Sequence, residues 1–341
     1  MPIQTVSQAF TNEGVGAFSF RNRIINGAMV IDQRNAGAAV TVSNNNSIFT
    51  TDRFRVDAPF DQSFTIQQQT SVIPIGFSHA LKVTAGTATS NTSNQPTVAH
   101  FIEGYNTADL GFGTANAKTF TLSFWVRSSL TGTFGVCFEN NNGDRAYIAS
   151  YTINVADTFE YKTVTIAGDT SGTWDTTNQR GLSIFFDLGY GTTWSAAASS
   201  AWANLSNDRG LTGGVKLAAN TGATWYITGV QLEVGSVTTP FERRPYGMEL
   251  ALCQRYYYSW SSSGLSDNYF LSSPYVSSPP NSSASVGYFF PVTMRANPTM
   301  AGTGLTLSRF TANQDGAVAQ LGSTSGATAY SLSAFTASAE L

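Results

Sequence analysis

The residues best suited to contact a ligand are aromatic side chains that stand in polar, turn-like sequence. Two stretches carry them, 173–178 and 189–195, and a further tryptophan follows soon after. Flat aromatic rings stack on the apolar faces of sugars, while amides and carboxylates bind sugar hydroxyls. This pattern predicts a glycan-binding surface, and its candidate residues are Trp174, Tyr190, Trp194, Trp202 and Asp175.

A competing interpretation gives these tryptophans a structural role. In this alternative, at least two of them cap the core or fill a contact between subunits. Trp125 and Trp225 differ from them because they stand within strand-like sequence, where large aromatic residues are typical. We therefore expect Trp125 and Trp225 in the core.

Hydrolytic chemistry has less support. No G-x-S-x-G elbow occurs, and His79 and His100 stand in separate segments, which weakens a Ser-His-Asp triad. Glycoside cleavage needs a pair of carboxylates, which sequence spacing alone does not identify. The acidic residues that such a pair would draw on are Asp144, Glu160, Asp175, Asp187 and Glu233. We expect no enzyme activity and no catalytic residue, with a depolymerase that uses Asp175 or Asp187 as the enzymatic rival.

Metal and cofactor sites are not expected either. Cys137 and Cys253 lie far apart, and with two histidines they give no metal-ligand spacing, so both are expected to be buried small hydrophobic residues. The loop 169–175 holds two carboxylates that calcium could use. It lacks the full acidic spacing of a calcium loop, and a solvated turn is the expected structure.

The composition excludes several classes of protein. The 341 residues include only 18 Lys and Arg and 21 Asp and Glu, or 11% of the chain, about half of the roughly 25% usual in soluble domains. No basic block exists to neutralise phosphates, so we expect no nucleic-acid partner. The first residues lack the pattern of a secretory signal, and no 18-residue apolar stretch occurs, so membrane insertion is not expected.

Alternating polar and apolar residues predict many short strands. In 119–127, for example, positions 120, 122, 124 and 126 are apolar and positions 119, 121 and 123 are polar. This strand and the next are expected to form a hairpin, and an Asn-rich turn at 140–144 leads to a third. The predicted strands are 119–127, 132–139, 145–153, 159–166, 181–188 and 224–233. The fold class that follows is all-β, an antiparallel β-sandwich.

One segment breaks this pattern. Residues 246–257 are rich in helix formers after Pro245 and predict a short helix, with Met248, Leu252 and Tyr256 on the face that packs on the sandwich. Polar, strand-like sequence resumes beyond it. The predicted division is an N-terminal attachment segment at 1–21, a β-sandwich at 22–245, a helical connector at 246–260 and a second, smaller C-terminal β domain at 261–341.

Several segments, taken in order, resemble a family of bacteriophage and prophage proteins usually labelled tail fibre or virion structural proteins. They cover about residues 22 to 258, and Asp52-Arg53-Phe54 stands where the family commonly has Asp-Arg-Trp. The segments that carry the resemblance are 22–37, 52–54, 102–118, 123–127, 227–235 and 241–257. The resemblance implies a jelly-roll-like sandwich of the carbohydrate-binding kind in a virion surface protein, commonly trimeric, that contacts host glycans.

From the resemblance we expect a non-enzymatic tail-fibre or spike component that is assembled in the host cytoplasm and released by lysis as part of the virion. Its expected partners are two further copies of itself, another virion protein bound through residues 1–21, and a host surface polysaccharide. Contact between subunits is expected at Tyr256, Tyr257, Tyr258 and Trp260, and packing within one chain is an equal alternative for these residues. The alternative function is that of a capsid-decorating protein with a purely structural role.

Overall fold

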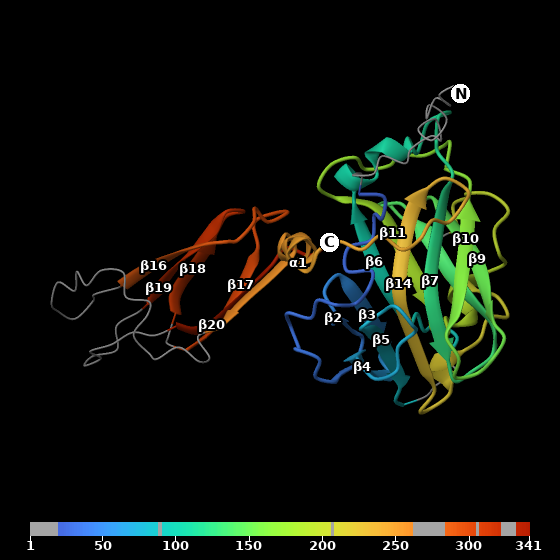
Figure 1. Cartoon of the computed structure of the whole chain (residues 1–341), viewed down its shortest axis with the longest axis horizontal. Helices are drawn as coiled ribbons and strands as arrows, with labels where there is room; N and C mark the ends of the chain where they lie inside the picture. The colour runs from blue at the N-terminus through green and yellow to red at the C-terminus, as the bar shows by residue number, and fades with distance from the viewer. Residues whose placement is uncertain (1–19, 88–90, 206–207, 262–283, 305–306, 322–331) are drawn as a thin grey trace, which may run out of the picture.

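The structure is a computed structural model that describes residues 20–87, 91–205, 208–261, 284–304, 307–321 and 332–341. Strands dominate it, and the apolar runs of the sequence are buried between two large sheets (Figure 1). The predicted fold class is confirmed: an antiparallel, jelly-roll-like β-sandwich with a short helix and a smaller C-terminal β unit. Of the predicted attachment segment, residues 1–19 lie outside the described residues.

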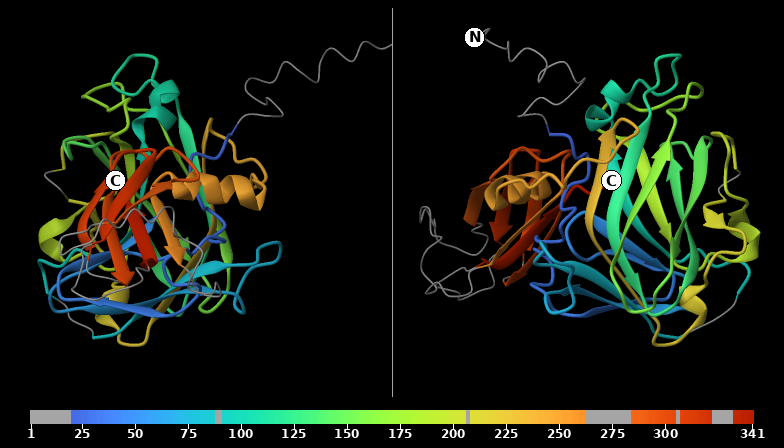
Figure 2. Two further views of the ribbon diagram at one scale, coloured as in Figure 1. Left: turned by 90° about the vertical axis from the view of Figure 1, so that its left-hand side faces the viewer. Right: turned by 45° about the vertical axis from the view of Figure 1, so that its right-hand side comes forward.

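Two six-stranded antiparallel sheets form the sandwich in the described part of the chain. Sheet A contains, in spatial order, β1 (Val40–Ser43), β4 (Ser63–Gln69), β5 (Ala80–Ala85), β14 (Thr224–Val234), β7 (Phe120–Ser128) and β10 (Glu160–Ile166). Sheet B contains β2 (Asn46–Phe49), β3 (Phe54–Ala58), β6 (Thr97–Glu103), β11 (Arg180–Asp187), β8 (Gly132–Glu139) and β9 (Ala146–Ile153). Figure 2 shows the two sheets as facing layers.

The core lies between the sheets and follows the predicted alternation. Phe120, Leu122, Phe124 and Val126 of β7 are fully buried there, and each such side chain contributes about 1.5–3 kcal/mol to folding. Trp225 of β14 is also fully buried, as predicted.

Trp125 does not share this environment. In β7 it lies on the same face as the polar residues 121 and 123, which is the outer face of sheet A. There it is half-buried and packs on Tyr161. Its predicted place in the core is therefore wrong: residue type favoured the core, but the pleat of the strand turns this side chain outward.

One predicted hairpin is also wrong. β7 and β8 follow one another in sequence but belong to different sheets, because β7 pairs with β14 and β10 while β8 pairs with β11 and β9. The connection at 129–131 crosses from sheet A to sheet B. The next turn is a hairpin as predicted, and the side-chain oxygen of Asn140 closes it by accepting the backbone N–H groups of Asp144 and Arg145 at 3.2 Å.

Short elements cover the ends of the sandwich. They are the 3-10 helices η1 (Gly104–Asn106), η2 (Ala108–Leu110), η3 (Thr192–Trp194) and η4 (Leu217–Ala219), and the paired strands β12 (Ser195–Ala196) and β13 (Gly210–Leu211). None of the helices in the described ranges is long and apolar enough to span a membrane.

The predicted helix forms as α1 (Tyr246–Gln254), three residues shorter than expected, because the chain enters β15 at Tyr257. Its predicted packing face is correct only in part. Tyr256 is fully buried and Leu252 is half-buried, but Met248 is 43% exposed, and the buried residues within the helix are Glu249 and Cys253. Polar contacts of Glu249 account for the side of the helix that is buried. The backbone N–H of Asn26 donates a hydrogen bond to the Glu249 carboxylate, and Arg244 lies 3.3 Å from the same group.

The C-terminal unit contains two three-stranded antiparallel sheets in the described residues. One contains β15 (Tyr257–Ser261), β20 (Leu332–Ser338) and β17 (Thr299–Gly304), and the other contains β16 (Ala284–Phe289), β19 (Gly316–Leu321) and β18 (Leu307–Ala312). In Figure 1 this unit stands to one side of the sandwich, with α1 between them. The strand β15 belongs to this unit and begins at Tyr257. The first strand of the C-terminal unit therefore follows soon after the helix, within the segment predicted as the helical connector.

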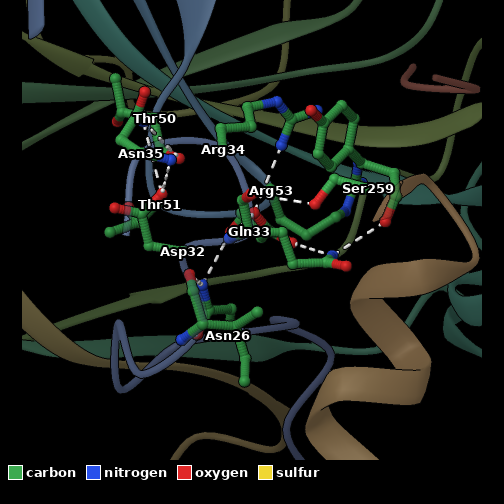
Figure 3. Close-up of polar contacts among 12 residues, drawn as sticks. Asn26, Asp32, Gln33, Arg34, Asn35, Thr50, Thr51, Arg53 and Ser259 are labelled. Carbon is green, nitrogen blue, oxygen red and sulfur yellow. Dashed lines mark hydrogen bonds and ion pairs between the residues drawn. The ribbon is translucent and has the colours of Figure 1, made fainter. Parts of the chain in front are cut away.

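Polar contacts join the C-terminal unit to the segment that opens the sandwich (Figure 3). The side-chain amide of Gln33 donates to the carbonyl of Tyr257 at 2.8 Å, and the hydroxyl of Ser259 donates to the carbonyl of Gln33 at 3.1 Å. Arg34 forms a 2.9 Å ion pair with Glu340 near the C-terminus. The segment before β1 therefore forms part of the junction between the two units.

Candidate functional site

Two of the predicted glycan-binding residues come together at one end of the sandwich. The rings of Trp174 and Trp202 are perpendicular with centroids 5.2 Å apart, and both pack on Phe112. Their indole N–H groups donate to backbone carbonyls, that of Trp202 to Ala167 at 2.7 Å and that of Trp174 to Ser171 at 3.2 Å. Both residues are half-buried against the core. Their contact with a glycan stays a prediction.

The acidic loop beside them is held by protein donors. Both oxygens of Asp169 accept hydrogen bonds from Arg145, at 2.6 and 2.7 Å, and this pairing raises the pKa of the Arg145 guanidinium. One oxygen of Asp175 accepts the N–H and the hydroxyl of Thr177, both at 2.7 Å. The two carboxylates therefore stabilise turns. In the described ranges, no group of three or more His, Cys, Asp and Glu side chains is placed to hold a metal ion.

Tyr190 and Trp194 lie in a different loop from Trp174 and Trp202. The Trp194 indole donates to the carbonyl of Ser93 at 3.1 Å, and its contact with a glycan also stays a prediction. The Tyr190 prediction requires correction, because this side chain is only 1% exposed and a Cβ on Gly210 would lie 2.2 Å from it. Its ring offers no free face on which a sugar could stack.

The residues predicted for subunit contact pack within the chain. Tyr256 is fully buried, with the Arg53 guanidinium 3.5 Å from the centre of its ring, so contact with another subunit is excluded for it in this conformation. Arg34 covers Tyr257 in the same way at 3.6 Å. Tyr258 and Trp260 pack on Phe335, in line with the intrachain alternative, and both remain half-buried.

The outer face of sheet A carries a hollow that the sequence interpretation did not identify. We call it the sheet A hollow, and its volume is about 720 Å³. Its lining residues come from β7, β10, β14 and two loops: Phe77, Ser123, Trp125, Tyr161, Gly229, Thr238, Thr239, Pro240, Phe241 and Arg243. Four aromatic rings thus stand beside hydroxyl groups and one exposed guanidinium.

The rings of the hollow form two pairs. Trp125 and Tyr161 are cross-strand partners in β7 and β10, with ring centroids 5.4 Å apart, and Tyr161 is 42% exposed. Phe77 and Phe241 meet edge to face at 5.2 Å, and Arg243 lies 4.9 Å from the centre of the Phe77 ring. The aromatic surface is therefore rigidly held and partly open to solvent.

A bulge in β14 makes room for these rings. The register of β14 against β7 shifts between Thr228 and Gln231, and Gly229 within the bulge has a φ of +62°. A Cβ at this position would lie 2.6 Å from Cζ of Phe77 and 3.1 Å from Cδ1 of Trp125. Glycine is required here both by its backbone conformation and by the close approach of the rings.

Comparison with known proteins gives structural similarity only. No protein-family model matches the chain, and no curated protein matches it in sequence. Similar solved structures include an arabinose-bound GH51 α-L-arabinofuranosidase at 15% identity, with a TM-score of 0.34 over 64% of this chain. The enzymatically active domain of bacteriophage CBA120 tailspike protein 4 aligns at 12% identity, with a TM-score of 0.32 over 62% of this chain. The matched regions span only 27% and 21% of those two chains.

Carbohydrate-binding modules are also among the similar structures. A family 11 carbohydrate-binding module from Clostridium thermocellum, solved with a β-1,3-1,4-mixed-linked tetrasaccharide, aligns at 11% identity and a TM-score of 0.29. That alignment covers 59% of this chain and 98% of the module.

Proposed function

We propose that this protein is a glycan-binding, non-enzymatic component of a bacteriophage tail fibre or spike. The observation that carries glycan binding is the sheet A hollow, in which Trp125, Tyr161 and Phe241 stand next to the hydroxyl of Thr238. Sugars present apolar C–H faces to aromatic rings and hydroxyls to polar neighbours, and the hollow supplies both kinds of contact.

The virion assignment rests on the sequence resemblance over residues 22–258. A trimeric appendage would present three copies of the hollow, so weak binding of single sugars would become strong binding to a polysaccharide. The second candidate function is that of a capsid-decorating protein, which the same resemblance allows.

The absence of enzyme activity is part of the proposal. The rival depolymerase would use Asp175 or Asp187, but both carboxylates already accept local hydrogen bonds. Asp187 is buried and accepts the backbone N–H groups of Gly189, Tyr190 and Leu211 at 2.6 to 2.9 Å. Burial raises the pKa of Asp187 and the three N–H groups oppose that rise. Release of new reducing ends from host polysaccharide by the wild type, and its loss in Asp175→Asn or Asp187→Asn, would establish the rival.

Glycan binding is tested by substitution in the hollow. We expect Trp125→Ala to weaken binding on a glycan array by about tenfold or more, since a central aromatic contact is lost. Tyr105→Ala, which removes a 62% exposed aromatic ring outside the hollow, serves as the control, and Trp194→Ala tests the other candidate loop. Loss of binding in Trp194→Ala with Trp125→Ala unchanged would move the site to the 189–195 loop that the sequence indicated.

The place of the protein on the particle is tested separately. An antibody against residues 261–341, viewed on phage particles by negative-stain microscopy, should label the ends of tail appendages. Label spread over the head would identify a capsid-decorating protein instead.

A further inference from the structure

A second cleft lies on sheet B, away from the sheet A hollow. We call it the sheet B cleft; its volume is about 470 Å³, and it is lined by residues around β2, β3 and β11, with Phe185 at its base. Phe185 meets Phe101 of β6 edge to face, with centroids 5.9 Å apart. Both rings are buried, so they form a floor for the groups above them and are not themselves open to a ligand.

Three arginines cover this aromatic floor. The guanidinium carbons of Arg55 and Arg180 lie 4.6 and 4.2 Å from the centre of the Phe101 ring, and that of Arg209 lies 4.7 Å from the centre of the Phe185 ring. All three arginines line the cleft. Stacking on the rings fixes the planes of the guanidinium groups, which leaves their N–H edges as the donors that a ligand can use.

Two of the three positive charges are neutralised within the protein. Arg55 forms a 2.8 Å ion pair with Asp57, and Arg209 forms a 2.8 Å ion pair with Glu139. Arg180 has no ion pair with any carboxylate of the described residues. Burial and the neighbouring charges of Arg55 and Arg209 lower the pKa of Arg180. Asp57 and Glu139, which pair with the other two arginines, oppose this lowering only in part. Arg180 therefore faces the cleft with no carboxylate partner of its own, close to two like charges, and an anion there would relieve the repulsion.

The rest of the lining contains the paired carboxylate of Asp57, the apolar Ala58, Pro59 and Phe60, and several neutral polar residues. Asn45, Asn46 and Ser47 stand on one side, and Ser93 and Gln95 are also among the lining residues. Amides and hydroxyls of this kind bind sugar hydroxyls, whereas a site for a polyanion such as nucleic acid would need a longer track of unpaired basic residues. The site thus combines one cation that lacks an ion-pair partner with neutral hydrogen-bonding groups and an apolar edge.

We propose that the sheet B cleft binds an acidic sugar, a uronic-acid unit of a polysaccharide, with Arg180 taking the carboxylate. A carboxylate would give Arg180 the ion-pair partner that it lacks, and its two oxygens match the paired donors of a guanidinium. This inference rests on the proposed function, since it takes the sandwich to bind glycans. It adds a second site and names the sugar class that this site selects.

The test compares four proteins on an array of uronic-acid glycans and neutral glycans with matched backbones. They are the wild type, Arg180→Gln, Trp125→Ala and the control Arg23→Gln, which removes a charge that pairs with Asp109 at the surface. We expect the wild type to bind the uronic-acid glycans about tenfold or more tightly than the neutral ones, because a charge-assisted pair is gained. Arg180→Gln should lose that advantage and keep its neutral binding, which also shows that it is folded. Trp125→Ala should keep the advantage, and Arg23→Gln should match the wild type.

Three results would overturn the inference while leaving the proposed function in place. They are equal binding of acidic and neutral glycans, an acidic preference that survives Arg180→Gln, and a preference for sulfated glycans over uronic acids. Binding of no glycan at all would refute the proposed function and this inference together.

Discussion

The hydroxyl of Tyr256 donates a 2.6 Å hydrogen bond to the carboxylate of Glu103 across 153 positions of sequence. Glu103 ends β6 of the sandwich, and Tyr256 stands between α1 and the first strand of the C-terminal unit. Arg255 pairs with the same carboxylate at 2.6 Å, and the guanidinium of Arg53 covers the Tyr256 ring. This buried group of charges joins the two units of the chain.

We predict that Tyr256→Phe lowers the free energy of unfolding by about 1.5–3 kcal/mol, the usual worth of a hydrogen bond to a charged group. The ring and its contact with Arg53 remain in the variant, so the loss isolates the hydroxyl. Chemical denaturation measures it. Tyr105→Phe is the matched control, because Tyr105 is 62% exposed and its variant should stay within about 0.5 kcal/mol of the wild type. Equal stabilities of the two variants would mean that the Glu103 bond contributes nothing.

Asp52 should make the stability depend on pH. Burial raises its pKa from 3.8 to about 6, against the opposing effects of Arg34 and of hydrogen bonds from Gln33. Because the folded state holds this proton more tightly than the unfolded chain, the stabilisation is complete below the unfolded pKa. It is lost as the pH rises through 6, by at most about 3 kcal/mol.

The variant Asp52→Asn does not titrate and should lack this slope. Urea denaturation of both proteins from about pH 4 to about pH 7 measures the difference, in which the titration of all other groups cancels. Parallel curves for the two proteins would show that Asp52 has an ordinary pKa in the folded state.

Period-two patterning predicts the strands of the sandwich well, because one face of each strand must be buried. It does not determine which sheet a strand joins. The short link between β7 and β8 suggested a hairpin, and only the packing of two layers sends these strands to opposite sheets. Trp125 shows a different error: its parity in β7 already indicated the outer face, and the size of the residue outweighed that signal.

The candidate sites depend on contacts that no local pattern reports. Phe77 and Phe241 come from two loops far apart in sequence, and the Gly229 bulge brings them beside Trp125. Arg55, Arg180 and Arg209 stand on separate segments that only the folded sheet gathers over Phe101 and Phe185. The place of Arg180 could have been predicted only from which strands lie beside β11, and the sequence does not give the order of the strands.

Calcium should have no effect on the loop 169–175. Both oxygens of Asp169 are taken by Arg145, and a cation would have to displace this guanidinium from a buried carboxylate. We expect the thermal midpoint to be the same with calcium and with a chelator. A midpoint raised by calcium and restored by the chelator would contradict this. Replacing Arg145 with Gln should lower stability by about 1–3 kcal/mol, because the buried Asp169 carboxylate loses two hydrogen bonds from a partly exposed guanidinium.

Gly229→Ala should change the shape of the sheet A hollow without removing any of its aromatic residues. The new methyl group would lie 2.6 Å from Phe77, so this ring and Trp125 must move apart. Gly213→Ala is a matched control, because Gly213 has a similar φ of +77° and no atom within 4 Å of its Cβ position.

Both variants bear the cost of a side chain at positive φ, about 1–2 kcal/mol. Only Gly229→Ala should also weaken glycan binding, by about tenfold relative to the control. If both variants bind glycans as the wild type does, while Trp125→Ala does not, then the Phe77 side of the hollow plays no part in binding. Binding would then depend on the Trp125 and Tyr161 pair alone, the half of the hollow that the pleat of β7 and β10 supplies without the bulge.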